Sequence, residues 1–163
     1  SVGCYSVTER QALSQAVNDA FGYSEQILVE KSVRPRELEV AAYEMNGQLH
    51  ITLPGEVIAP DGAFYSYDEK YSNSSHSLTE VEAKNLTEEQ VKAIRQASET
   101  VFKQMNLRHL SRIDFFLTED GEIYLNEVNT FPGMTPISMF PKMLQNNGHK
   151  FHQFLADCIE TTM

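Results

Sequence analysis

The 163-residue sequence has few cysteines, few basic side chains and no apolar run long enough to cross a membrane. It carries 13 Lys and Arg against 23 Asp and Glu, a net charge of −10, so nucleic acids and anionic membranes are not expected as partners. Its two cysteines, Cys4 and Cys158, lack the spacing of a metal site and suit a reducing compartment. Because no signal-peptide pattern precedes the first residues, we expect a cytoplasmic protein.

Two apolar runs around an Asp-Gly turn signal form the most informative stretch of the sequence. Residues 113–117 and 123–128 flank Asp120-Gly121, and Asp-Gly between β-rich runs predicts an antiparallel hairpin. We take Asp120-Gly121 as a two-residue turn, which fixes the strand register by counting outwards. A longer turn or a bulge would shift that register.

The register gathers four polar side chains on one face of the hairpin, with Asp114 opposite Glu127 and Arg112 opposite Asn129. Two carboxylates in direct opposition repel each other, so a positive group is expected between them. Oxygen ligands favour Mg²⁺, Ca²⁺ or Mn²⁺ over zinc, and Mg²⁺ is often held by one or two carboxylates together with substrate phosphates. The alternative is a solvated polar face in which Arg112 pairs with a carboxylate.

The chain leaves the second strand through a turn at Pro132-Gly133. Thr135 is expected as the N-cap of a helix, with Pro136 at its first position and Ser138 in its first turn. A helix N-terminus presents free amides and the positive end of a dipole, which together favour an anion. The alternative is an ordinary capped helix start with a solvated serine.

These motifs, an Arg-x-Asp strand, a Glu-x-Asn strand and a Pro-Gly-Met-Thr loop in that order, resemble the C-terminal portion of D-alanine–D-alanine ligase, a member of the ATP-grasp superfamily. The resemblance implies an α+β fold, with an antiparallel sheet, packing helices and a central β-hairpin from Arg112 to Asn129. It also implies that residues 1–163 are the C-terminal part of an ATP-grasp catalytic domain. The N-terminal domain, the first strands and the phosphate-contacting lysines are then expected upstream.

The resemblance implies a ligase that joins two D-alanines for peptidoglycan precursor synthesis and hence for the cell wall. ATP phosphorylates one carboxylate to an acylphosphate, which the amine of the second D-alanine attacks. Asp114, Glu127 and Asn129 match the magnesium ligands of the family. Two ions are expected, with Glu127 between them, and Mn²⁺ is expected as a substitute.

The same resemblance assigns catalytic roles around these ligands. Arg112 and the backbone amide of Gly133 match the donors to the oxyanion that forms during attack. Ser138, with the amide of Met139, matches the pair that binds the carboxylate of the second substrate.

A nucleotide site is expected around the start of the predicted strand at Arg36–Met45. The resemblance assigns Glu37 to the ribose hydroxyls, although the alternation of the strand makes Glu37 and Glu39 equally suited to face solvent. Residues 27–29 are predicted to form a buried strand. The segment after this strand resembles the hinge that docks the adenine in the family. The alternative is that the strand ends in a solvated charge pair. The hinge residues are Glu30, Lys31 and Val33.

Between Pro54 and Glu80 the sequence is rich in Ser, Asp and Tyr and poor in aliphatic side chains, and we place a lid at residues 60–80. A long segment of this kind that keeps its aromatics predicts a mobile lid rather than simple disorder. It resembles the omega loop of the family, in which Lys70 would meet the ATP phosphates and Tyr71 would help to position the catalytic assembly. This Lys-Tyr pair favours an amine nucleophile, and Phe64 fits either a residue near the adenine or ordinary core packing.

The remaining elements are expected to be scaffold. Capping boxes predict two helix starts, one at residues 6–9, in a helix that ends at Gly22, and one at Thr87, in a helix that runs to Met105. Two further helices are predicted at residues 137–144 and 151–159, and an Asn46-Gly47 hairpin turn follows the strand that starts at Arg36.

Three alternatives to a D-alanine–D-alanine ligase stay open from the sequence. The nearest is another ATP-dependent carboxylate–amine ligase, such as a D-alanine–D-serine type. The second is a non-catalytic Mg-nucleotide binding module, which would describe the isolated 163 residues if they are inactive alone. The third is a structural α+β domain with an acidic hairpin. The resemblance further implies a homodimer for the full-length protein.

Overall fold

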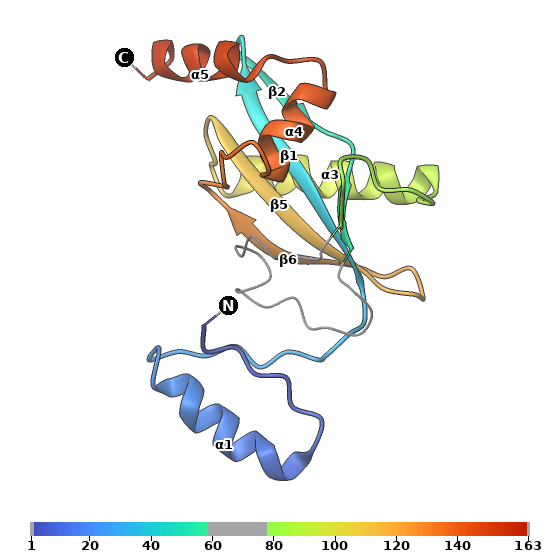
Figure 1. Ribbon diagram of the computed structural model, residues 1–163, viewed down its shortest axis with the longest axis vertical. Coiled ribbons are helices and arrows are strands. Elements are labelled where there is room, and N and C mark those ends of the chain that lie inside the picture. Colours follow the sequence, from blue (N-terminus) through green and yellow to red (C-terminus); the bar gives the residue numbers. More distant parts are fainter. Residues whose placement is uncertain (1, 59–77, 163) are drawn as a thin grey trace. The chain divides into compact units, whose positions relative to one another are not determined.

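A computed structural model describes residues 2–58 and 78–162, which form an α+β fold (Figure 1). The described chain divides into two compact units, residues 2–34 and residues 35–58 with 78–162. The first unit contains α1 (Arg10–Phe21), and the second contains all the strands and the other helices. Phe64, Lys70 and Tyr71 of the predicted lid lie outside the described residues.

The first unit corrects two predictions. Glu9, not Ser6, is the N-cap of α1, and its side chain makes no capping hydrogen bond, so the predicted capping box at residues 6–9 is wrong, although α1 does end at Gly22. The strand predicted at residues 27–29 is also wrong, because Leu28 is 87% exposed, Val29 is 73% exposed, and neither pairs with a strand among the described residues. Without a neighbouring strand, the backbone groups of an extended segment have no ladder partners.

The second unit is built on a sheet in which every pairing is antiparallel. The long central strand, β1 (Arg36–Met45), has the bounds that the sequence predicted. Asn46 (φ 52°) and Gly47 (φ 71°) form the predicted turn after it. The order is β4-β3-β1-β5-β6, with β2 paired to β1 as well. The strands are β1 (Arg36–Met45), β2 (Gln48–Ile51), β3 (Gly55–Ile58), β4 (Leu78–Glu80), β5 (Leu110–Leu117) and β6 (Ile123–Asn129).

The segment that the sequence gives to a lid is bordered by two short strands. β3 pairs with β4, and Glu56 lies opposite Glu80 in this ladder. The last three residues of the predicted lid, 78–80, form β4, which is paired with β3.

The hairpin of β5 and β6 has the predicted pairs from Arg112 to Asp114, but its turn and the pairs nearer the turn differ from the prediction. The amide of Thr118 donates to the carbonyl of Glu122, and the amide of Gly121 (φ 87°) donates to the carbonyl of Thr118, so the loop has three residues instead of two. The register then shifts between Asp114 and Phe115, which restores the pairing of Asp114 with Glu127. The longer turn and the irregularity compensate each other.

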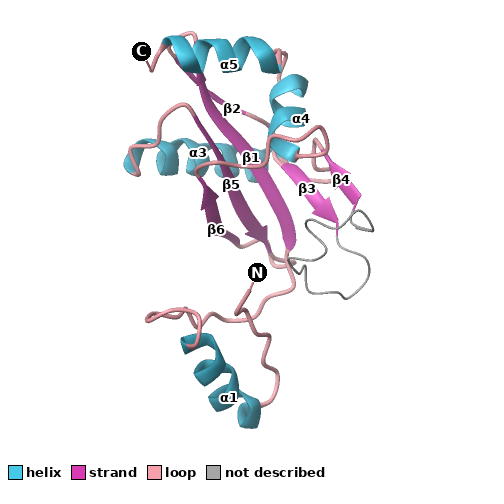
Figure 2. Ribbon diagram, turned by 60° about the vertical axis from the view of Figure 1, so that its left-hand side comes forward, coloured by secondary structure: helices cyan, strands magenta, loops and turns pink. Residues whose placement is uncertain are grey.

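Helices cover the two faces of this sheet unequally (Figures 1 and 2). Helix α3 (Glu88–Gln104) packs on one face, and its Thr87 capping box is present as predicted. Leu38, Val40 and Ile113 form the centre of the core beneath α3.

The opposite face is covered at one end by α4 (Met139–Asn146) and α5 (Phe151–Glu160). Ala41 and Tyr43 of β1 pack there against the apolar side chains of both helices. Because side chains alternate along β1, Glu37 and Glu39 belong to this same face, beyond the part that packs against the helices.

Helix α4 starts later than predicted. Ser138, not Thr135, is its N-cap, and the Ser138 amide donates to the Thr135 carbonyl at 2.9 Å, which closes a turn over residues 135–138. Pro136 therefore lies in this turn instead of the first position of the helix.

Candidate active site

Arg112 is the centre of a charged cluster on the face of the sheet beyond the helices. It is held by Asp114 two residues further along β5: Nε donates to Oδ1 at 2.8 Å and Nη2 donates to Oδ2 at 2.7 Å. The same Nη2 lies 3.4 Å from Oε1 of Glu39 and 3.9 Å from Oε1 of Glu127. One guanidinium thus interacts with carboxylates from β1, β5 and β6.

Asn129 completes the cluster from the end of β6. Its Nδ2 donates to Oδ2 of Asp114 at 3.1 Å and to Oε1 of Glu127 at 3.2 Å. The cross-strand register that brings these three residues together is the predicted one. Arg112, Asp114, Glu127 and Asn129 therefore share a face, as the sequence indicated.

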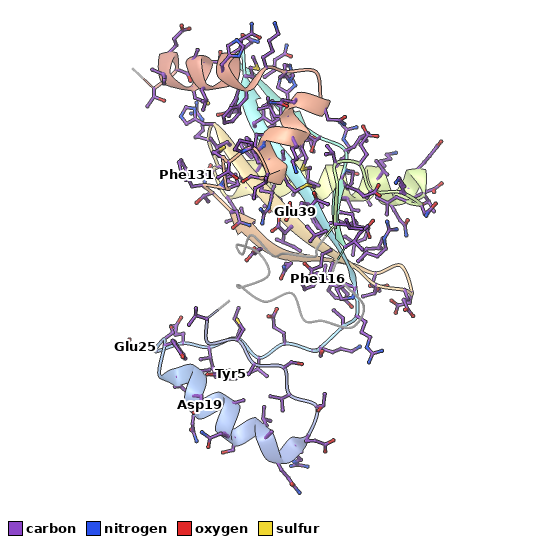
Figure 3. All side chains as sticks on the ribbon, viewed as in Figure 1. Tyr5, Asp19, Glu25, Glu39, Phe116 and Phe131 are labelled. Carbon is purple, nitrogen blue, oxygen red and sulfur yellow. The ribbon has the colours of Figure 1, made fainter. Side chains whose placement is uncertain are left out.

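Glu39 joins this cluster without having been predicted as a site residue. It pairs with Asp114 across the β1–β5 ladder and is 8% exposed, so it does not face solvent freely (Figure 3). The alternation of β1 put Glu37 and Glu39 on one face, but it could not show which of them lies beside Arg112. Glu37, two residues earlier on the same face, is half-buried and lies opposite Phe116.

The electrostatics of the cluster follow from burial and pairing. Burial alone would lower the pKa of the Arg112 guanidinium, but its hydrogen bonds to Asp114 and the charges of Glu39, Asp114 and Glu127 raise that pKa overall. Burial raises the pKa of the Asp114 carboxyl above its ordinary value, and Glu127 adds to this, against the opposing effect of Arg112. A bound cation would favour the ionised form of Asp114.

The donor set fits a hard divalent cation. The amide group of Asn129 lies within hydrogen-bond distance of one oxygen of each carboxylate, and rotating this amide would bring its oxygen to the same place. Two carboxylates and one amide oxygen are ligands that Mg²⁺ accepts. Within residues 2–58 and 78–162, no three His, Cys, Asp or Glu side chains gather as a cation site.

The loop after β6 brings Gly133 against Ser138. A β-carbon at Gly133 would lie 2.7 Å from Oγ of Ser138, so only glycine fits at this position without displacing the serine. The Ser138 hydroxyl also accepts from the amide of Thr135 at 3.2 Å and lies 2.8 Å from the Thr135 hydroxyl. The turn therefore holds one hydroxyl and the first free amides of α4 together.

Three of the predicted nucleotide contacts belong to the first compact unit. Glu30 and Lys31 are exposed and Val33 is half-buried, and all three belong to the first unit. The lid residues named above lie outside the described chain. The nucleotide contacts assigned to these residues stay predictions.

Residues 1–160 match the family described as D-ala D-ala ligase C-terminus. The chain is 91% identical over its full length to a D-alanine–D-alanine ligase of Vibrio campbellii, of which it covers 50%. A crystal structure of D-alanyl-alanine synthetase A from Vibrio cholerae is 64% identical, with a TM-score of 0.91 over 99% of this chain and 48% of that one. The D-Ala:D-Ser ligase VanG from Enterococcus faecalis is 34% identical, with a TM-score of 0.77 over 93% of this chain and 43% of its own.

The chain spans about half the length of the curated relatives that it matches. The solved structures confirm the α+β fold with an antiparallel sheet that the sequence predicted. In the part of the chain that the structure describes, no helix is both long and apolar enough to cross a membrane.

Proposed function

The chain belongs to the family of the D-alanine–D-alanine ligase C-terminus, and we propose that it forms the C-terminal part of an ATP-dependent ligase that joins two D-alanines. The observation that carries this proposal is the cluster of Arg112, Asp114, Glu127 and Asn129 on one face of the sheet. Residues 1–163 would be part of an ATP-grasp catalytic domain, and residues upstream would supply the rest of the active site.

Asp114, Glu127 and Asn129 would hold Mg²⁺, with Glu127 between two ions if two are bound. When bound, Mg²⁺ neutralises the charge on the phosphate oxygens of ATP and helps to align them for transfer. The two carboxylates are already oriented toward one point by the amide of Asn129. Little rearrangement of the backbone would therefore be needed for binding.

Arg112 would stabilise the negative charge that develops on the carbonyl oxygen when the amine attacks the acylphosphate. Its guanidinium stays protonated, because the surrounding carboxylates raise its pKa further above the physiological range. The backbone amide of Gly133 would be a second donor to this oxyanion. Its hydrogen bonds to Asp114 hold the Arg112 guanidinium in place before the reaction, which is a condition for effective electrostatic stabilisation.

The turn at the start of α4 would bind the carboxylate of the second D-alanine. The Ser138 hydroxyl and the amide of Met139 lie at the N-terminus of this helix, where a carboxylate is favoured. Glu37 would contact the ribose of ATP, with Glu30, Lys31, Val33 and Phe64 around the adenine. Lys70 and Tyr71 would close over the phosphates.

A D-alanine–D-serine ligase is the second candidate, because the similarity to VanG extends over 93% of this chain. Both reactions use an amine nucleophile and the same phosphoryl transfer. The second substrates differ in their side chain, a methyl group in D-alanine and a hydroxymethyl group in D-serine.

We propose a cytoplasmic location for the whole protein, and Cys4 and Cys158, which are both free thiols, fit this compartment. The product would enter peptidoglycan synthesis. The family resemblance is the basis for proposing a homodimer. D-alanine would be the substrate of both half-reactions.

The proposal is tested with the full-length protein, Mg²⁺ and ATP. Phosphate release should require D-alanine, and the product should be D-alanyl-D-alanine. D-serine added together with D-alanine should give little mixed dipeptide. Release that does not depend on D-alanine would contradict the proposed substrate, and a predominant D-alanyl-D-serine product would favour the second candidate.

A further inference from the structure

Glu39 is a buried carboxylate that the proposed mechanism does not yet use. It lies between Gly55 of β3 and Asp114 of β5 in the sheet register. On the Gly55 side, a β-carbon would lie 2.5 Å from the terminal methyl of Met139, so the start of α4 packs directly against this part of the sheet. Glu39 is therefore placed where the apolar packing of the helices meets the charged cluster (Figure 3).

Glu39 and Arg112 are both largely shielded from water. Their side chains are 10% and 17% exposed, and Oε1 of Glu39 lies 3.4 Å from Nη2 of Arg112. A buried carboxylate is strongly unfavourable unless a positive group compensates it. The guanidinium supplies that compensation, and the carboxylate in turn attracts the guanidinium toward β1.

Metal binding would change which carboxylate holds Arg112. Its strongest contact is with Asp114, at 2.7 and 2.8 Å, but Asp114 and Glu127 are proposed cation ligands. Oxygens that coordinate Mg²⁺ give up part of their interaction with a neighbouring guanidinium. Glu39 is the third carboxylate next to Nη2 and is not a proposed ligand.

We infer that Glu39 is a positioning residue, which keeps the Arg112 guanidinium on the reacting face of the sheet while Asp114 and Glu127 hold the cation. This inference rests on the proposed function, because Arg112 is taken as the oxyanion donor.

The test compares Glu39→Gln with the wild type in the full-length protein, measured below the melting temperature of both. Glutamine keeps the shape but removes the charge, so the guanidinium should lose its fixed position. We expect kcat to fall about tenfold or more, since small misplacements of a reacting group have effects of up to about a hundredfold. KM for ATP should stay within about threefold.

Glu44→Gln is the matched control. Glu44 is another carboxylate of β1 that pairs with an arginine, Oε2 lying 3.0 Å from Nε of Arg108, but it does not belong to the cluster. Its substitution should lower the melting temperature without changing kcat. Glu39→Asp is a second variant, which retains the charge with a shorter reach and should recover part of the lost kcat.

A second readout does not depend on turnover. Crystal structures of the wild type and of Glu39→Gln are compared with Mg²⁺ and a non-hydrolysable ATP analogue bound. The guanidinium of Arg112 should contact Glu39 in the wild type and move away from β1 in the variant.

An unchanged kcat in Glu39→Gln would overturn the inference, and so would a lower kcat with Arg112 in its original position. If the wild-type protein showed no D-alanine-dependent phosphate release, the proposed function would be wrong, and the proposed role of Glu39 would be wrong with it. The wild-type measurement alone distinguishes this case from a failure of the inference.

Discussion

Asp114 and Glu127 lie directly opposite each other on β5 and β6, and one amide nitrogen of Asn129 donates to both carboxylates. Like charges at opposed positions of a sheet are normally destabilising. Arg112 and Asn129 compensate for the repulsion in the structure. We expect a divalent cation to replace part of this compensation when nucleotide binds.

Replacing one of the two carboxylates should weaken metal binding with little effect on the stability of the protein. The Glu127 side chain is 46% exposed, so Glu127→Gln should change the free energy of unfolding of the metal-free protein by less than about 0.5 kcal/mol. Its affinity for Mg-ATP should fall at least about tenfold, as expected when a metal site loses a ligand. Calorimetric titration of the full-length variant measures the affinity.

Glu119→Gln is the control for this change, since Glu119 is an exposed carboxylate at the turn of the same hairpin. It should bind Mg-ATP as the wild type does. Equal affinities for the Glu127 and Glu119 variants would show that Glu127 is only a surface charge.

The contact between Gly133 and Ser138 predicts that a single methyl group impairs substrate binding. In Gly133→Ala the new β-carbon would displace the Ser138 hydroxyl, from which it would be only 2.7 Å away. A hydrogen bond to a charged group contributes about 1.5–3 kcal/mol, so KM for the second D-alanine should rise about tenfold or more. Steady-state kinetics with varied D-alanine measure this value.

Ser138→Ala should raise KM to a similar extent, because it removes the same hydroxyl. Thr100→Ala removes a distant hydroxyl on α3, which donates to the carbonyl of Gln96 at 2.8 Å, and should leave KM unchanged. If Gly133→Ala and Ser138→Ala both had the wild-type KM, the carboxylate site would have to lie elsewhere.

Gly55 should be intolerant of any side chain. A β-carbon there would lie 2.5 Å from the methyl of Met139 and 2.9 Å from the carbonyl oxygen of Glu80. We expect Gly55→Ala to lower the free energy of unfolding by about 1–3 kcal/mol, the usual effect of overpacking. Urea unfolding of the variant gives this value. Gly22→Ala, at the end of α1, should have a smaller effect, and a Gly55 variant as stable as the wild type would contradict the close packing of α4 on β3.

The histidine pair beside Tyr43 predicts a loss of stability in acid. Burial and then the charge of His149 lower the pKa of His50, whose ring centroid lies 4.6 Å from that of His149. The unfolded chain therefore takes up a proton at His50 more readily than the folded one. Stability is complete above the unfolded pKa of about 6.5 and falls as the pH decreases through the folded value.

Unfolding experiments between about pH 5 and 8 measure this dependence. The decrease below about pH 6.5 should be smaller in His50→Gln. It should persist in His152→Gln, since His152 is exposed on α5. An identical pH profile for the wild type and His50→Gln would exclude His50 as the source.

The sequence predicts the charged face of the hairpin correctly, although one of its premises is wrong. Asp120-Gly121 indicates a two-residue turn, but Thr118 hydrogen-bonds to Glu122 and lengthens the loop. The irregularity beyond Asp114 then restores the register. The alternation of side chains along a strand indicates which of them share a face. It does not reveal an extra turn residue whose effect on the register is cancelled by an irregularity further along the strand.

Other features depend on tertiary contacts that no local pattern contains. Glu39 and Glu37 have the same alternation, and only the pairing of β1 with β5 places Glu39 opposite Asp114. Residues 27–29 have the composition of a buried strand, yet no described strand pairs with them. The start of α4 moves to Ser138 because residues 135–138 close a turn first.

The transfer of labelled oxygen from D-alanine to phosphate tests the proposed reaction most directly. The full-length protein is given Mg²⁺, ATP and D-alanine labelled with ¹⁸O in the carboxylate, and the released phosphate and dipeptide are analysed by mass spectrometry. An acylphosphate formed at the Arg112–Asp114 cluster predicts one labelled oxygen in phosphate for each D-alanyl-D-alanine. Phosphate without label, or release without the dipeptide, would contradict the proposed ligase.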